Sequence, residues 1–287
     1  MSPTVAAVIP VYRPDDAALL ALVDDLRSRD LPLLVADDAS PCTADAVLRE
    51  AADRGARVTR HRRNAGIARS LNDGLRFAAS LDAAWLLTVD QDSVLAPDHL
   101  DLLLAEAGRA AEMLGPDRIG AVAAGAIDDA SGALGYPSTV HDGVVTTEEV
   151  IQTGTIWAVD ALIALGGFDE SLGIDAVDAA ACLALRSVGM SIVLAPDLRV
   201  EHRIGEGRQV RVLGRSVLAS GHSPDRRTTI VRNRLRLFPG EFAQSPSHAV
   251  RTLRRVAVQT SLAVTVEDDR WAKAKASVRG LLPRREG

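Results

Sequence analysis

Apolar and polar positions follow two distinct patterns over the first ninety residues. The segment TVAAVIPVY, residues 4–12, is almost continuously apolar and rich in β-branched side chains, which is typical of a parallel strand covered on both faces. Between residues 14 and 28 the apolar side chains recur at helical spacing, with aspartates early and arginine late. This second pattern predicts an amphipathic helix.

Strand and helix patterns continue to alternate as far as Val89. We predict strands at residues 31–37, 57–61 and 85–89, and helices at residues 43–54 and 66–79. Elements that alternate in this way through short turns indicate an α/β fold, with a mostly parallel central sheet flanked by helices and joined by right-handed crossovers.

Beyond Asp92 the patterns are less regular. They predict helices at residues 97–113 and 175–188, a helix closed by Gly166 and Gly167, strands at residues 119–126, 153–159 and after Gly189, and a loop or hairpin over residues 128–143. From Arg208 onward we predict mainly helix. The simplest division is an α/β domain at residues 1–240 and a helical C-terminal extension at residues 241–287.

The composition is that of a folded globular protein, since 47% of the 287 residues are hydrophobic and 25% are charged. No window reaches the roughly 18 consecutive apolar residues of a membrane span, and the first residues enter a strand pattern instead of a signal peptide. Cys42 and Cys182 supply neither a disulfide framework nor paired zinc ligands. We expect a cytoplasmic protein.

Polar residues stand at the ends of three consecutive predicted strands. In chain order they are Asp37 and Asp38, Asn64 and Gly66, and Asp90 and Asp92. In an open parallel sheet, ligands bind beyond the carboxyl ends of the strands. We therefore expect these residues to line one site.

Asp90 and Asp92 are two residues apart, so in an extended segment both carboxylates point to the same side and repel each other unless a cation lies between them. Carboxylates without thiolates or paired histidines favour Mg²⁺ or Mn²⁺, which keep open positions for phosphate oxygens. An EF-hand would need an oxygen ligand and a glycine where Val94 and Leu95 stand. The spacing alone also suits a helix cap or turn, but its place at a strand end favours a metal site.

Seven segments form a recognisable series. They are VIPVYRP from Val8, DDAS from Asp37, NAGIARSLNDG from Asn64, VDQDS from Val89, GGFDESLGIDAVDAAACLALRSVG from Gly166, VEHRIG from Val200 and RRTTIVRN from Arg226. Together they resemble the inverting glycosyltransferases of family 2, which have the GT-A fold, and most closely the bacterial rhamnosyltransferases. The resemblance covers about residues 4–237 in order, so it is more specific than any one segment.

The resemblance implies roles for individual residues. Asp178 corresponds to the catalytic base, Asp92 to the main metal ligand, and His202 to a second ligand of the metal or the diphosphate. The residues implied on the nucleotide and donor side are Pro10, Tyr12, Asp37, Asp38, Asn64, Gly66, Asp90, Gln91, Arg227 and Arg232. Of the aspartates after the second strand, Asp38 is the preferred contact for the base or ribose, while the alternative role of the pair is to cap the following turn.

The resemblance also implies a reaction, a single displacement that inverts the sugar carbon, with dTDP-rhamnose as donor, Mg²⁺ or Mn²⁺ as cofactor, and a glycan or polyprenyl-linked acceptor. A UDP-sugar as donor in place of dTDP-rhamnose stays open. A nucleotide-sugar-binding protein without turnover also stays open, because Ala179, Ala180 and Ala181 stand where the family carries an acid and an aromatic. A dinucleotide oxidoreductase is set aside, since the first turn, PVYRPDD, lacks the required glycines.

Basic residues are concentrated toward the C-terminus, although the net charge is −5. The segment DDRWAKAKASVRGLL, residues 268–282, predicts an amphipathic helix with Trp271 on one side and lysines on another. Such a helix suits peripheral contact with an anionic membrane, and packing on its own domain or on a second subunit in a homo-oligomer are the alternatives. We expect no nucleic-acid partner.

Overall fold

The computed structural model describes residues 4–129, 132–201, 208–212, 215–219 and 221–282, and the chain divides into two compact units. The first unit comprises Met1–Asp128, Ala133–Gly173 and Val177–His202, and the second comprises Asp129–Gly132, Ile174–Ala176 and Arg203–Gly287. The boundary predicted between residues 240 and 241 falls inside α7, Pro224–Gln244, whereas the units divide near residue 202.

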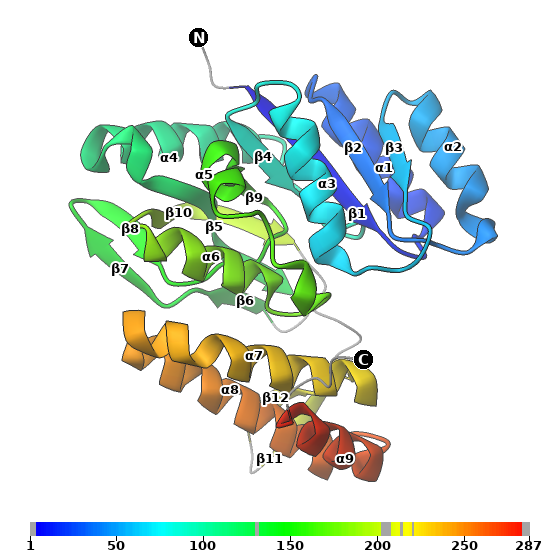
Figure 1. Ribbon diagram of the computed structural model, residues 1–287, viewed down its shortest axis with the longest axis vertical. Helices are drawn as coiled ribbons and strands as arrows, with labels where there is room; N and C mark the ends of the chain where they lie inside the picture. Colours follow the sequence, from blue (N-terminus) through cyan, green and yellow to red (C-terminus); the bar gives the residue numbers. More distant parts are fainter. Residues whose placement is uncertain (1–3, 130–131, 202–207, 213–214, 220, 283–287) are drawn as a thin grey trace. The chain divides into compact units, whose positions relative to one another are not determined.

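A mixed sheet forms the centre of the first unit (Figure 1), and its strand order over the described residues is β3-β2-β1-β4-β9-β5-β10-β8-β7, with β6 beside β5. The strands are β1 Val5–Val11, β2 Leu33–Asp37, β3 Arg57–Arg60, β4 Trp85–Thr88, β5 Ile119–Asp129, β6 Gly132–Gly135, β7 Ser138–His141, β8 Val144–Thr147, β9 Thr155–Ala158 and β10 Ser191–Glu201. Strands β3, β2, β1 and β4 are mutually parallel, as are β5 and β10. The predicted parallel core is confirmed, and β9 runs antiparallel between β4 and β5.

Helices cover both faces of this sheet. In β1, Ala7 and Ile9 belong to one apolar cluster while Ala6 and Val8 belong to the other, which explains the continuous apolar run of this strand. The first cluster includes residues of α1 (Asp16–Ser28), α2 (Asp45–Asp53) and α4 (His99–Leu114). The second includes residues of α3 (Ile67–Ala79), α5 (Val159–Ala164) and α6 (Val177–Ser187).

The start of α6 differs from the prediction. The sequence pattern begins the helix at Asp175, but Asp175 and Ala176 have φ values of +66° and +62°. These values belong to the left-handed region, which a right-handed helix excludes. The helix therefore begins at Val177, and Asp178 lies in its first turn.

The second unit contains a two-stranded sheet and three helices among the described residues. Strands β11, Arg208–Val212, and β12, Arg215–Ala219, pair antiparallel, so the prediction of helix from Arg208 is wrong for this stretch. In the first of these strands the residues from Gln209 to Val212, QVRV, alternate between polar and apolar with the two-residue period of strands. Helices α7, α8 (Pro246–Thr265) and α9 (Arg270–Gly280) follow.

The helices of the second unit pack closely. A Cβ atom on Gly280 of α9 would lie 2.7 Å from Cβ of Val231 on α7, so only glycine allows this approach. Lys273 of α9 is buried with Glu267, and their Nζ and Oε2 atoms are 2.8 Å apart. Of the helices in the described ranges, none combines the length and apolar character required to span a bilayer.

Candidate functional site

The predicted site residues at the ends of β1, β2 and β4 lie along one edge of the central sheet. The register pairs Val11 of β1 with Asp37 of β2, and Asp37 with Arg60 of β3, so these strands end together. Because β9 runs antiparallel to β4, its first residue, Thr155, lies opposite Thr88, the last residue of β4. The loop that precedes β9 is therefore brought to the same edge as the carboxyl ends of the parallel strands.

This loop holds Asp90. The backbone N–H of Asp90 donates to Oγ1 of Thr153 at 2.9 Å, and the side-chain amide of Gln152 donates to Oδ1 of Asp90. Oγ of Ser93 lies 2.8 Å from the same Thr153 hydroxyl. Asp90 is half-buried by these contacts, whereas Asp92 is exposed. The strand end thus carries one half-buried aspartate and one exposed aspartate.

Gln91 fixes the chain after β1. Its side-chain oxygen accepts from the backbone N–H of Tyr12 at 3.0 Å, and its side-chain nitrogen donates to the Tyr12 carbonyl at 3.3 Å. The Tyr12 side chain is 42% exposed, and the Arg13 guanidinium lies 5.2 Å from the centroid of its ring. Pro10 is buried within β1. Tyr12 is therefore the member of this group with an exposed aromatic surface.

The carboxylate of Asp37 makes contacts within the protein. Its carboxylate is fully buried and accepts from the backbone N–H of Ser40 at 3.1 Å. It also pairs with the guanidinium of Arg60, whose Nε lies 2.9 Å from Oδ2. These contacts close the turn after β2, in agreement with the alternative role as a turn cap.

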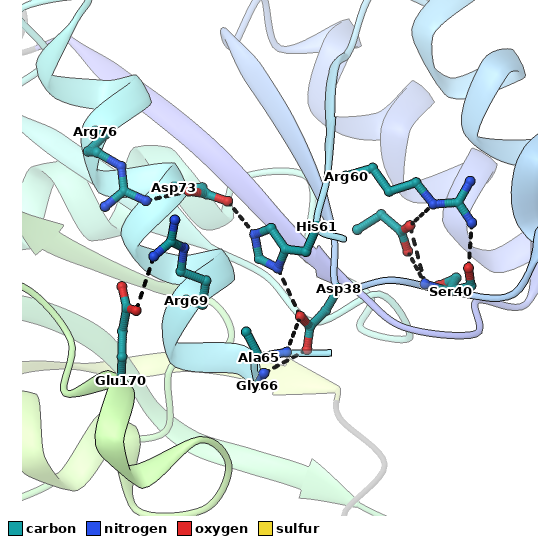
Figure 2. A network of polar contacts seen from close by, with 11 residues as sticks. Asp38, Ser40, Arg60, His61, Ala65, Gly66, Arg69, Asp73, Arg76 and Glu170 are labelled. Atoms are coloured by element: carbon teal, nitrogen blue, oxygen red, sulfur yellow. Dashed lines mark hydrogen bonds and ion pairs between the residues drawn. The ribbon is translucent and has the colours of Figure 1, made fainter. Parts of the chain in front are cut away.

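Asp38 holds the loop before α3. Its Oδ1 accepts from the backbone N–H of Ala65 at 2.7 Å, and its Oδ2 accepts from that of Gly66 at 2.8 Å. Figure 2 also shows His61 between two carboxylates, with Nδ1 2.8 Å from Asp38 and Nε2 2.6 Å from Asp73. Asn64 is exposed on the loop that Asp38 fixes.

The carboxylates of Asp38 and Asp73 affect the protonation of His61. Burial of the ring is the largest single influence and opposes the charged form, but the hydrogen bonds to Asp38 and Asp73 outweigh it and raise the pKa of His61 above its ordinary value. Sequence reasoning missed His61, because its partners come from the end of β2 and from the middle of α3.

Gly66 joins this loop to the segment before α6. Its φ is +90°, and a Cβ atom at this position would lie 2.7 Å from Cα of Gly173. On the same helix, the side-chain amide of Asn72 exchanges two hydrogen bonds with the backbone of Phe168, at 2.8 and 2.9 Å. The nucleotide-side loop leads directly into α3, and α3 contacts the segment that leads to Asp178.

Asp178 is half-buried in the first turn of α6, and its Oδ1 accepts from the backbone N–H of Ala179 at 2.8 Å. Burial, with the charge of Asp178 as a further cause, raises the pKa values of Tyr136 and Cys182. The Tyr136 hydroxyl in turn accepts from the backbone N–H of Ile151 at 3.2 Å. Residues 150–153 thus link the surroundings of Asp178 to Asp90.

Sequence reasoning did not identify Tyr136, Gln152 or Thr153. The signal that was available is the segment IQTG, residues 151–154, immediately before the buried strand β9. Its importance follows only from the antiparallel direction of β9, which apolar periodicity does not reveal.

Of the three remaining predicted residues, two belong to the second unit and one is not described. His202 is outside the described residues, although the backbone of its neighbour Glu201 accepts from Val94 N–H at 3.3 Å, two residues from Asp92. Arg227 and Arg232 lie on α7 in the second unit. Arg227 is fully buried, and burial lowers its pKa against the opposing charges of Glu267 and Asp175.

The oxygen ligands at the end of β4 fit a hard divalent cation. Asp92 presents an exposed carboxylate, while Asp90 beside it is oriented by Gln152 and Thr153. The side-chain oxygen of Gln152 is itself buried without a hydrogen-bond partner among the described residues. A site of carboxylate oxygens with an oriented neighbour suits Mg²⁺ or Mn²⁺.

Comparison with known proteins identifies the family. Residues 6–126 match glycosyl transferase family 2, and this range contains all but the first residue of β1, the strands β2–β4 and the polar ends of these strands. Over 248 residues the chain is 27% identical to the dTDP-rhamnosyl transferase RfbF of Shigella flexneri, with 81% of this chain and 79% of that protein covered. Residues 6–126 thus match the family 2 glycosyltransferases, and most of the chain is similar to a rhamnosyltransferase. The family predicted from its motifs is thereby confirmed.

Solved structures share the fold of this glycosyltransferase. S. aureus TarS 1-349 in complex with UDP-GlcNAc matches with a TM-score of 0.57 and 16% identity over 95% of this chain and 79% of that one. GalNAc-T7 with UDP, GalNAc and Mn²⁺ matches with a TM-score of 0.58 and 15% identity over 80% of this chain. The glycosyltransferase spans 47% of the GalNAc-T7 chain. The predicted GT-A type α/β fold is confirmed.

Proposed function

We propose that this glycosyltransferase moves rhamnose from dTDP-rhamnose to a hydroxyl group of a glycan or lipid-linked glycan, with inversion and with a divalent metal ion. The observation that carries the proposal is the similarity to the Shigella flexneri dTDP-rhamnosyl transferase over four fifths of the chain. The polar edge of the first unit supplies the chemistry that such a transfer requires, on the donor side and on the acceptor side.

On the donor side, we assign the nucleotide to the region between Tyr12, Asp38 and the loop that carries Asn64. Tyr12 offers an exposed ring for stacking on a base, and Asp38 fixes the loop through Ala65 and Gly66. The contacts of Asp38 within the protein make its effect on the nucleotide indirect. Donor contacts by Arg227 and Arg232 remain predictions from the motif alone.

Asp92 would hold the metal ion, Asp90 would support it, and His202 is the predicted second ligand. The bound ion offsets the negative charge that grows on the departing nucleoside diphosphate. Support for Asp92 comes from its exposure beside an anchored Asp90, and support for His202 comes from the pairing of Glu201 with Val94. Mg²⁺ and Mn²⁺ both suit these ligands.

Asp178 is the proposed base. It accepts the proton of the acceptor hydroxyl while that oxygen bonds to the anomeric carbon, and the bond from this carbon to the diphosphate oxygen breaks on the opposite face. The partial positive charge at the start of α6 stabilises the carboxylate. Its half-buried position is compatible with contact between Oδ2 and a bound acceptor.

A UDP-sugar is the second donor class, because TarS, which shares the fold, was solved with UDP-GlcNAc. Calorimetry with dTDP-rhamnose, UDP-sugars and GDP-sugars, each with and without Mn²⁺, separates these donors. We expect dTDP-rhamnose to bind most tightly and to be turned over in the presence of a glycan acceptor. Preference for a UDP-sugar would overturn the rhamnose assignment, and binding without any transfer or hydrolysis would favour a binding protein.

The outer face of α9 suggests that the transfer takes place at a membrane surface. Lys273, Ala276 and Gly280 are buried against the rest of the second unit, whereas Trp271 and Val278 are 84% and 61% exposed. Trp271, Lys275 and Val278 share one side of the helix, and Arg279 is exposed beside them. An apolar strip edged by cations is suited to an anionic bilayer surface. We propose peripheral attachment of this face, close to a lipid-linked acceptor.

A further inference from the structure

His61 connects two parts of the donor side that come from different elements. Its Nδ1 atom lies 2.8 Å from Oδ1 of Asp38, at the end of β2, and its Nε2 atom lies 2.6 Å from Oδ2 of Asp73, in α3 (Figure 2). The side chains of His61, Asp38 and Asp73 are 13%, 7% and 17% exposed. The three groups therefore form a nearly buried chain of acid, imidazole and acid.

To donate to Asp38 and to Asp73 at the same time, His61 needs a proton on both of its ring nitrogens. A neutral imidazole donates from one nitrogen only, and ionised carboxylates only accept. If the ring were neutral, one nitrogen lone pair would face a carboxylate, and the two acids would repel each other with a single N–H between them. The geometry is that of an imidazolium.

The other charges around His61 agree with this state. Arg76 of α3 donates to the other oxygen of Asp73, and Arg60 of β3 pairs with Asp37 rather than with Asp38. The two hydrogen bonds raise the pKa of His61, although burial, the largest influence, acts against them. The backbone N–H of His61 donates to the carbonyl of Asp37 at 2.9 Å, so β2 holds the residue in place.

Asp38 connects His61 to the loop at residues 61–66, which we assign to the nucleotide. Its two oxygens accept from the backbone N–H groups of Ala65 and Gly66. These bonds set the path of residues 61–66, which carry Asn64 and end at the start of α3. A change in the bond between His61 and Asp38 therefore acts on the loop that we assign to the donor.

We propose that His61 is a positioning residue for the sugar nucleotide: as an imidazolium it clamps Asp38 to α3 and keeps the loop at residues 61–66 in its binding conformation. The proposal rests on the proposed function, since it takes the ligand to be a nucleoside diphosphate sugar. Loss of the proton breaks one of the two bonds and loosens the loop. Donor binding weakens as a result, while the chemical step at Asp178 is unchanged.

The test is calorimetric titration of the full chain with dTDP-rhamnose and Mg²⁺ between about pH 6 and pH 9, on either side of a histidine pKa raised above 6.5. The diphosphate diester of this donor does not titrate in that range. We expect the dissociation constant to rise about five- to tenfold with pH, as for the loss of one hydrogen bond of typical net strength. Deprotonation of His202, the predicted metal ligand, would change the affinity in the opposite direction.

Two variants make the test specific. His61→Gln keeps one donor group without a titrating ring, so it should bind weakly throughout and show no pH dependence in this range. Asp73→Asn removes one of the two negative charges, so the pH midpoint should move down while the change in affinity persists. His141→Gln is the matched control, because His141 is 74% exposed and lies 3.5 Å from Asp142.

The outcomes separate this inference from the proposed function. If the wild type binds dTDP-rhamnose with the same affinity at every pH, or if Asp73→Asn leaves the midpoint in place, His61 is not the positioning residue and the donor assignment stands. If the wild type binds no dTDP-rhamnose at any pH, the donor assignment fails first. In transfer assays the wild type should show the pH effect in KM, and an equal effect in kcat would contradict the proposal.

Discussion

Gly66 lies against the backbone of Gly173: a Cβ atom on Gly66 would come within 2.7 Å of Gly173 Cα. Gly66 belongs to the loop held by Asp38, and Gly173 stands five residues before Asp178 in the chain. The nucleotide-side loop and the segment that leads to the proposed base are therefore in van der Waals contact. A change at either glycine should affect both.

Replacing Gly66 with alanine should weaken donor binding and lower stability. The new Cβ would meet the Gly173 backbone, and the φ of +90° adds strain of about 1–2 kcal/mol for an L-residue. Gly143→Ala is the matched control, since Gly143 has a φ of +77° but open space around its Cβ position. Thermal unfolding and dTDP titration should show a clearly larger effect for Gly66→Ala, and equal effects would mean that the contact is unimportant.

Gln152 should tune the metal site through Asp90. Its side-chain amide orients the Asp90 carboxylate, and loss of a group that orients a ligand typically costs about 10–100-fold in metal affinity. We expect Gln152→Ala to raise the Mn²⁺ concentration at half-maximal activity by about tenfold, with dTDP binding in the absence of metal unchanged. Gln259→Ala on α8 serves as the control. An unchanged Mn²⁺ requirement in Gln152→Ala would contradict the assignment of the metal site to Asp90 and Asp92.

Asp178→Asn should reduce kcat without altering donor affinity. A general base contributes about 10²–10⁴-fold to a rate, so we expect a loss of that order in transfer. Asp160→Asn is the control, because Asp160 is also an acid in the first turn of a helix, α5, and it is exposed. If both variants keep wild-type kcat in an acceptor-saturated assay, Asp178 is only a partner of the helix dipole.

The face of α9 should bind vesicles that contain phosphatidylglycerol and not vesicles of phosphatidylcholine alone. Trp271 reports binding by a blue shift of its emission, because Trp157 is fully buried and only Trp271 among the tryptophans is strongly exposed. Val278→Asp should weaken binding about tenfold or more, whereas Val140→Asp, at a valine of β7 that is 72% exposed, should not. A blue shift that depends on protein concentration without lipid would indicate a second copy of the chain instead.

Local patterns predicted the first four strands, the helices between them and the acids at their ends. These features depend on periodicity and on residues next to one another, as at Val89 to Asp92. The motifs then supplied the family and Asp178. The strands at residues 208–212 and 215–219 were missed although QVRV alternates in the first of them, because the long arginine-rich stretch that follows favours helix.

Contacts between distant residues could not be predicted in the same way. Asp38 binds Ala65, Gly66 and His61, and Asp90 binds Gln152 some sixty residues later. Those partners depend on strand order and on the reversed direction of β9, which are properties of the whole sheet. The sequence therefore located the acids and their edge, while the structure identifies the residues that hold them.

The most direct test is the effect of Mn²⁺ on dTDP binding, measured by calorimetry for the wild type, Asp92→Ala and Asp24→Ala. Asp24 is an exposed carboxylate of α1 that pairs with Arg54 on the surface, so its variant controls for loss of charge. If Asp92 holds the ion that contacts the diphosphate, Mn²⁺ should tighten dTDP binding in the wild type and in Asp24→Ala and have no effect in Asp92→Ala. An undiminished effect of Mn²⁺ in Asp92→Ala would contradict the account.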